Sequence, residues 1–154
     1  MNFNKFLATA ALAIATVVVP SAEAFTDGQR NLDAALTQAG VSTTVGACKS
    51  ATAYGYFVPA ENHIHICDNV ATTEEKVMET WKHEAIHAAQ RCVNPSMAFT
   101  VTTSQFLMDN GSQSDWDFIQ EAYDREDWAI ELEAFTLMRY DAQVIADIVN
   151  DACN

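Results

Sequence analysis

The stretch EEKVMETWKHEAIHAAQRC, residues 74–92, decides the fold. Apolar side chains recur in it every three or four positions, which is the period of one face of an α-helix. They are Val77, Met78, Trp81, Ala85, Ala88 and Ala89. A cap at Thr72 or Thr73, with Glu75 in a capping box three residues after Thr72, predicts where the helix begins. Asn94-Pro95 predicts its end, because proline cannot continue a helix, so one long amphipathic helix is expected at the centre of the fold.

Two histidines and a glutamate in this stretch have the spacing of a metal site. His83 and His87 stand one helical turn apart on the same face, so their imidazoles can hold one zinc ion. Glu84 follows the first histidine directly and can act as a general base beside that ion. A pattern with three fixed positions also arises by chance, and a purely structural domain therefore stays an alternative.

A catalytic zinc ion needs a third protein ligand, and a later helical segment, residues 128–135, offers two carboxylates. At about 100° per residue, Glu131 falls within the apolar stripe of that helix and Glu133 on its polar side. A carboxylate that points into a core needs a partner, because an isolated buried charge is costly. Glu131 is therefore the predicted third ligand, with Glu133 as the alternative. Without a metal, Glu131 would instead pair with Arg125 or Arg91.

Residues 1–24 are expected to be a secretory signal peptide. Lys5 gives a positive start, and Phe6 to Val19 form an apolar run. Ala22-Glu23-Ala24 then supplies the small residues that precede a cleavage point. A membrane anchor is the alternative, but the run is shorter than the ~20 residues that span a bilayer. We therefore expect a secreted or periplasmic protein with one mature domain, residues 25–154.

All four cysteines lie in the mature chain, and an even number in an exported protein favours two disulfides. Four cysteines allow three pairings, between which sequence alone does not choose. Cys48 and Cys67 flank a predicted hairpin, which their pairing would staple. Cys92 and Cys153 would tie the end of the long helix to the last helix. Free thiols or a cysteine-bound zinc are the alternative, weakened because no C-x-x-C spacing occurs.

The other elements predict an α+β fold, a small sheet followed by a mostly helical half. Strands are predicted at Val41–Val45, Ala53–Val58 and His63–Cys67, the last two as a hairpin around Pro59-Ala60-Glu61-Asn62. Helices are predicted from Thr26 to Gly40, Met97–Met108, Trp116–Tyr123, Trp128–Tyr140 and up to Cys153. Five aromatic residues with helical spacing are assigned to the core: Trp81, Phe106, Trp116, Phe118 and Trp128.

The chain is strongly acidic, with a formal net charge of −13 that removal of the signal peptide leaves unchanged. Such a surface repels nucleic acid and anionic lipid. No other stretch is long and apolar enough to span a membrane. The zinc-peptidase spacing of His83, Glu84 and His87 is what implies a peptide or protein substrate, and the oligomeric state is left open.

These residues resemble a known class of enzymes. His83-Glu84-x-x-His87, followed by Glu131-x-x-Ala134 on a later helix, is similar to the gluzincin branch of the zincin metallopeptidases. The run Ile64–Asn69, the long helix and Cys92 are similar to the mitochondrial peptidase family that processes a subunit of ATP synthase. They are also similar to small bacterial and phage metallopeptidases. The resemblance covers residues 64–92 and the Glu131 segment.

The resemblance implies a secreted zinc-dependent endopeptidase. Zinc held by His83, His87 and Glu131 would lower the pKa of its water towards ~7. Glu84 would take the proton and pass it to the leaving amine. The strand His63–Cys67 would be the sheet edge beside the cleft, where a peptide adds as a further strand. The alternative is a catalytically inactive binding protein on the same scaffold, with zinc absent or purely structural.

The resemblance also leaves the surroundings of the site open. Gluzincins often carry Asp or Asn four residues after the ligand glutamate to orient a histidine, but Phe135 stands there, so Asp124, Asp127 or a backbone carbonyl is expected to replace it. Candidates for stabilising an oxyanion are His63 or His65, otherwise exposed polar positions of an edge strand, and Tyr123 or Tyr140. In the binding protein, His63 or His65 would be the fourth metal ligand.

Overall fold

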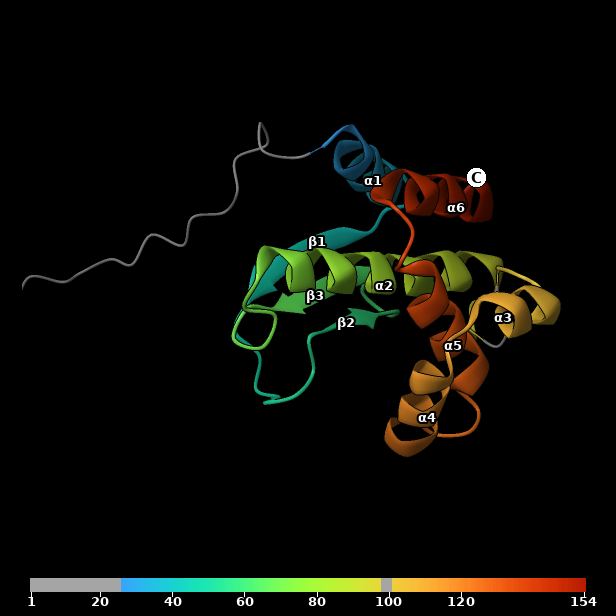
Figure 1. The fold of residues 1–154 in the computed structure, drawn as a ribbon. Coiled ribbons are helices and arrows are strands. Elements are labelled where there is room, and N and C mark those ends of the chain that lie inside the picture. The colour runs from blue at the N-terminus through green and yellow to red at the C-terminus, as the bar shows by residue number, and fades with distance from the viewer. Residues whose placement is uncertain (1–25, 98–100) are drawn as a thin grey trace, which may run out of the picture.

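The computed structural model describes residues 26–97 and 101–154, which form six helices and one three-stranded sheet (Figure 1). The expected α+β class is confirmed. The helices are α1 (Asp27–Gln38), α2 (Glu74–Val93), α3 (Ser104–Asn110), α4 (Gln113–Ala122), α5 (Trp128–Leu137) and α6 (Ala142–Cys153). The strands are β1 (Ser42–Gly46), β2 (Gly55–Val58) and β3 (His63–Cys67). The predicted signal peptide, residues 1–24, lies outside the described residues.

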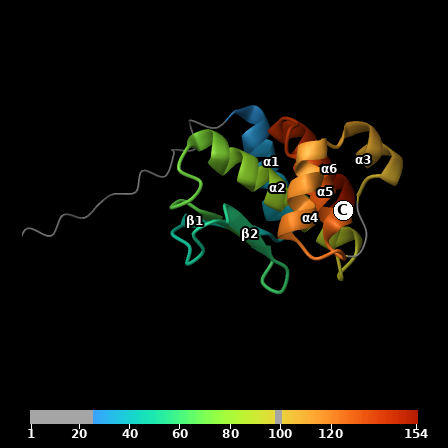
Figure 2. The ribbon, with the colours of Figure 1, turned by 60° about the horizontal axis from the view of Figure 1, so that its bottom comes forward.

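The long helix α2 lies at the centre of the molecule, between the sheet and the other helices (Figures 1 and 2). Of the two candidate caps, Thr73 is the one used, and its hydroxyl accepts the backbone N–H of Lys76. The helix ends at Asn94, as expected. Helix α6 packs against both α1 and α2, and α5 packs against α2. The core between these elements is apolar and includes Leu32, Leu36, Ile64, Ile66, Trp81, Ile86, Ile145 and Val149.

Strand β3 is the central strand of the sheet, whose order is β1-β3-β2. The predicted hairpin is confirmed, because β2 and β3 pair antiparallel. The prediction that β3 is the edge beside the cleft is wrong. The hairpin occupies one side of β3, and β1 pairs in parallel with its other side. The edge strand next to α2 is therefore β2.

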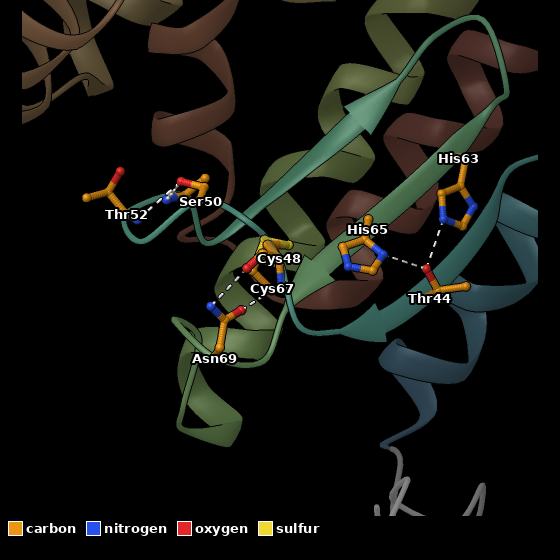
Figure 3. Close-up of a disulfide and its surroundings, with 9 residues drawn as sticks. Thr44, Cys48, Ser50, Thr52, His63, His65, Cys67 and Asn69 are labelled. Atoms are coloured by element: carbon orange, nitrogen blue, oxygen red, sulfur yellow. Dashed lines mark hydrogen bonds between the residues drawn. A yellow bond between two sulfur atoms is a disulfide. The ribbon is translucent and has the colours of Figure 1, made fainter.

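Both disulfides that the cysteine positions suggested are present. Cys48 bonds to Cys67, and Cys92 bonds to Cys153. In Figure 3, Asn69 lies beside the first disulfide, where its side chain accepts from the backbone N–H of Cys48 and donates to the carbonyl of Cys48. The second disulfide joins the last turn of α2 to the last turn of α6. It therefore fixes the end of the helix that carries the two spaced histidines.

The helical half differs from the prediction in where α3 begins and in how deeply some aromatic residues are buried. The helix expected at Met97–Met108 begins only at Ser104, because Thr103 caps it, and residues 98–100 of that prediction lie outside the described residues. Trp81 is buried as expected, but Phe118 is 50% exposed. Phe106, Trp116 and Trp128 are half-buried.

In the described part of the chain, no helix combines the length and the apolar character needed to cross a membrane.

Candidate metal centre

The two histidines of α2 point to one place on the buried face of that helix. His83 and His87 are 8% and 6% exposed, and their Nε2 atoms are 3.1 Å apart. The spacing of four residues explains this arrangement, because residues i and i+4 stack on one face of a helix. Two imidazole nitrogens so close together offer two metal-ligand atoms.

Helix α5 brings Glu131 to the same place. His83 Nε2 lies 3.3 Å from Glu131 Oε2, and His87 Nε2 lies 3.4 Å from Glu131 Oε1. Among the described residues, these three side chains form the one group of at least three potential ligands, with ligand atoms within 4.8 Å of one another. The alternative ion pair of Glu131 with Arg91 or Arg125 is not formed. Arg125 instead lies over the ring of Trp128.

The separations between these atoms fit a small metal ion. An ion with tetrahedral bonds of about 2.05 Å holds its ligand atoms about 3.3 Å apart. The separations of 3.1, 3.3 and 3.4 Å in this cluster are close to that value, with the two histidines facing different oxygens of Glu131. Glu131 Oε2 is also buried, and its contact with His83 Nε2 at 3.3 Å does not have the geometry of a hydrogen bond. A buried polar atom of this kind is costly unless something binds it. The cluster can therefore hold a metal ion.

Electrostatics in the metal-free site favour charge on both sides of this cluster. Burial lowers the pKa of His87, but the carboxylates of Glu131 and Glu84 outweigh burial and raise the pKa to about 9. Burial raises the pKa of Glu131, but the close contacts and charge of the His83 and His87 imidazoles outweigh burial and lower the pKa to about 2. Without a metal, the carboxylate therefore pairs with an imidazolium, and a metal ion would take the place of that proton.

Gln90 is a site residue that the sequence analysis missed. Its side-chain Oε1 lies 2.8 Å from His87 Nδ1, where Asp124, Asp127 or a carbonyl was expected to act. Its Nε2 donates to the carbonyl oxygen of Ile130 and to Glu133 Oε2, each at 2.9 Å. The helical period contained the signal, because Gln90 lies three residues after His87 and so on the same side of α2.

Glu133 is fully buried, and the prediction that it lies on the polar side of its helix is wrong. It accepts backbone N–H bonds from Val101 at 3.0 Å and Thr102 at 2.6 Å, and a further bond from the Thr102 hydroxyl. Helix α5 is buried on more than one side, because α2 packs on it together with α3 and α4. The helical period therefore could not separate an inner from an outer glutamate.

Phe135 packs its ring edge-on against His83, with the ring centroids 4.7 Å apart. The position where an orienting carboxylate was expected thus supplies an apolar wall. Asp127 lines a cavity beside the site, and its carbonyl accepts the N–H of Glu131 at the start of α5.

Two cavities flank the histidine cluster. The larger, about 570 Å³, is mostly apolar and is lined by Tyr54, Ala122, Phe118, Phe135 and Met138 among others. The smaller, about 380 Å³, is lined by β2 and by all three potential metal ligands. Glu84 and Tyr123 line both cavities. The smaller cavity therefore gives access to all three potential ligands, whereas the larger one reaches only His83.

Tyr123 is the one of the two tyrosine candidates that lies at the cluster. Burial, followed by the charges of Glu131 and Glu84, raises the pKa of its hydroxyl, which keeps the hydroxyl protonated. Tyr140 is 38% exposed, and its carbonyl accepts a bond from Lys82 Nζ.

The histidines of β3 lie on the face of the sheet opposite α2, so their candidate roles as oxyanion donor or fourth ligand are wrong, and they are polar positions of the sheet. His63 Nδ1 meets the hydroxyl of Ser42 at 2.8 Å. The hydroxyl of Thr44 lies 2.9 Å from His63 Nε2 and 2.8 Å from His65 Nδ1 (Figure 3). Because successive residues of a strand alternate in direction, the neighbouring Ile64 faces α2 and the two histidines face away. Neither can reach the α2 cluster as an oxyanion donor or a fourth ligand.

Comparison with known proteins identifies the family of this chain. No curated protein and no solved structure matches the chain. A family model described as a domain of unknown function, DUF8637, matches residues 23–153, which is most of the chain. The chain therefore belongs to the DUF8637 family.

Proposed function

We propose that this protein is a zinc-dependent endopeptidase that acts outside the cytoplasm. The observation that carries the proposal is the convergence of His83, His87 and Glu131 in a cleft that Glu84 also lines. Two imidazoles and one carboxylate are the protein ligands of many catalytic zinc sites, which keep a further position for water or substrate. Two disulfides agree with an exported protein.

The residues around the ligands suit peptide hydrolysis. A bound zinc ion supplies Lewis acidity and lowers the pKa of water. Glu84 directly follows a ligand histidine, so its carboxylate accepts the proton of the attacking water and passes it to the leaving amine nitrogen. The protonated hydroxyl of Tyr123 interacts with Glu131 and Glu84 and donates a hydrogen bond to the substrate carbonyl oxygen.

Strand β2 offers the main-chain groups that bind an extended peptide. The Cys67 N–H donates to the Tyr54 carbonyl, so Tyr54 and Tyr56 use their main-chain groups towards β3. By the alternation of antiparallel strands, Gly55 and Phe57 direct theirs to the open edge. These residues line the smaller cavity, and a substrate adds there as a further strand.

The larger cavity favours a substrate with a bulky apolar side chain next to the scissile bond. Phe118, Phe135, Ala122 and Met138 form its apolar walls, and Glu84 stands at its boundary with the smaller cavity. The 50% exposure of Phe118 fits this role, because the ring has a face left for a ligand to cover.

Metal analysis and peptidase assays of the purified protein test the proposal. Wild-type protein is expected to bind one zinc ion and to cleave peptides with bulky apolar residues. Glu84→Gln should retain zinc and lose cleavage, whereas Glu131→Ala should lose both. Glu75→Gln, an exposed change on the same helix, is the matched control and should change neither. Unchanged zinc binding in Glu131→Ala, or equal cleavage by Glu84→Gln and wild type, would show that the assignment is wrong.

A further inference from the structure

Two buried polar residues lie behind the metal ligands, and we propose that Gln90 and Glu133 are positioning residues that hold His87 ready to bind a metal. Both are fully buried, one on α2 and the other on α5. The inference rests on the proposed metal site and concerns how the chain prepares one of its ligands.

The orientation of the Gln90 amide is fixed by its surroundings. Its Nε2 lies 2.9 Å from two oxygens, the Ile130 carbonyl and Glu133 Oε2. Both oxygens act as acceptors, so the donating NH₂ group of Gln90 must face them. A flipped amide would place Oε1 against two acceptors, which loses two buried hydrogen bonds and adds repulsion. Gln90 Oε1 is therefore directed at His87.

This orientation dictates which nitrogen of His87 carries hydrogen. Gln90 Oε1 only accepts, so His87 Nδ1, at 2.8 Å, must be the donor. In the neutral ring the other nitrogen, Nε2, then keeps its lone pair. Nε2 is the atom directed at His83 and Glu131. The amide thus selects the tautomer that binds a metal through Nε2.

Glu133 in turn holds Gln90. Besides the Gln90 bond, it accepts from the N–H groups of Val101 and Thr102 and from the Thr102 hydroxyl. Four donors on two oxygens fill the usual acceptor positions of a carboxylate and lock its rotamer. Thr103, the next residue, caps α3. The orientation of His87 therefore depends on the segment that leads into α3, through a chain of hydrogen bonds rather than through the ligands themselves.

Gln90→Met tests the inference, because methionine has a similar length and no amide. The zinc dissociation constant, from competition with a chromophoric chelator, is expected to rise about 10–100-fold. In ¹⁵N-edited spectra of zinc-loaded wild type, His87 should show a slowly exchanging proton on Nδ1, and in Gln90→Met this proton should exchange rapidly. Ile145→Val, a buried change on α6, is the control for lost stability and should alter neither readout.

The possible results separate this inference from the proposed function. A folded Gln90→Met protein that binds zinc as tightly as wild type would overturn the inference, even if wild type is an active peptidase. Should Gln90→Met not fold, the wild-type spectrum decides: a protected Nδ1 proton supports the inference, and a freely exchanging one contradicts it. A wild type with the expected affinity and spectrum but no peptidase activity refutes the proposed function alone. A wild type that binds no zinc refutes both.

Discussion

The chain carries two histidine pairs, one on α2 and one on β3, and each pair points to one side of its own element. His83 and His87 are four residues apart on a helix, and His63 and His65 are two apart on a strand. Both spacings place two imidazoles on a common face. The difference lies in what stands opposite.

The β3 pair faces hydroxyl groups, and the α2 pair faces a carboxylate. Ser42 and Thr44 on the neighbouring strand can each donate or accept, so they satisfy the nitrogens of His63 and one nitrogen of His65. An ionised Glu131 can only accept hydrogen bonds. The Nε2 atoms of His83 and His87 lie 3.3 and 3.4 Å from its oxygens and 3.1 Å from each other. Spacing alone therefore places the rings, and the facing element decides whether they form a metal site.

Replacing one histidine from each pair should give the largest difference between the two pairs, measured as zinc binding. His87→Ala removes one of three ligands, so zinc retained after dialysis should fall to the detection limit. His65→Ala should retain the wild-type stoichiometry, because its ring lies on the other face of the sheet. The measurement is metal content per folded chain. Equal loss in both variants would contradict the division between the two pairs.

The two glutamates of α5 extend the contrast from metal binding to stability. Glu133→Ala leaves the N–H groups of Val101 and Thr102 without their acceptor, and the Gln90 amide keeps only the Ile130 carbonyl. Each such buried group costs about 1–3 kcal/mol, so the free energy of unfolding should fall by roughly 3 kcal/mol or more. Glu131→Ala should cost the metal-free protein less, because its two partners, His83 and His87, can still hydrogen-bond to each other through their Nε2 atoms. Urea titrations of both variants in chelator measure the difference, and a larger loss for Glu131→Ala would reverse the assignment.

Gly55 and Gly46 face opposite sides of the sheet, so an alanine at each position tests how tightly that side is packed. A Cβ at Gly55 would lie 2.6 Å from Thr80 Cγ2 and 2.8 Å from the His65 carbonyl oxygen, so Gly55→Ala must push β2 away from α2. We expect a loss of about 1–3 kcal/mol, as for other overpacked sites. A Cβ at Gly46 meets nothing closer than His65 Cε1 at 3.5 Å, so Gly46→Ala should be tolerated. Thermal unfolding of the two variants checks this, and a larger destabilisation by Gly46→Ala would contradict it.

The pH dependence of the metal-free protein gives the smallest expected effect. The pKa of His87 is raised from 6.5 to about 9, so its contribution is fully present below pH 6.5 and is lost as the pH rises through about 9. The pKa of Glu131 is lowered from 4.5 to about 2, so its contribution is lost only as the pH falls through about 2. Between about pH 6.5 and 9, Tm should therefore decline in chelator. His87→Gln should remove this slope, and an equal slope in that variant would assign it to other groups.

Much of the architecture follows from local sequence. The apolar period of residues 74–92, the cap at Thr73 and the stop at Asn94 predict α2, and the turn at Pro59–Asn62 predicts the hairpin. The positions of the cysteines suggested both disulfides. These features depend on neighbours in the chain, for which period and turn chemistry are direct evidence.

The centre of the site was predictable only in part. The spacing of His83 and His87 places their rings together, and the apolar surroundings of Glu131 selected it as the third ligand. Glu133 was placed on the polar side of its helix because α5 is packed on more than one side, where a single helical stripe no longer separates inside from outside. Gln90 was missed because its partners, Ile130 and Glu133, lie on another helix far along the chain.

The sequence by itself determined the elements, the pair of adjacent imidazoles on α2 and the cysteines available for cross-linking, because these are properties of short stretches of chain. Only the tertiary structure decided that β3 is central, that His63 and His65 face away from α2, and that Gln90 lies between His87 and Glu133. The physical reason is that strand order and buried hydrogen-bond partners depend on groups far apart along the chain. Gln90 and Glu133, for example, are 43 residues apart and meet only when α2 and α5 pack.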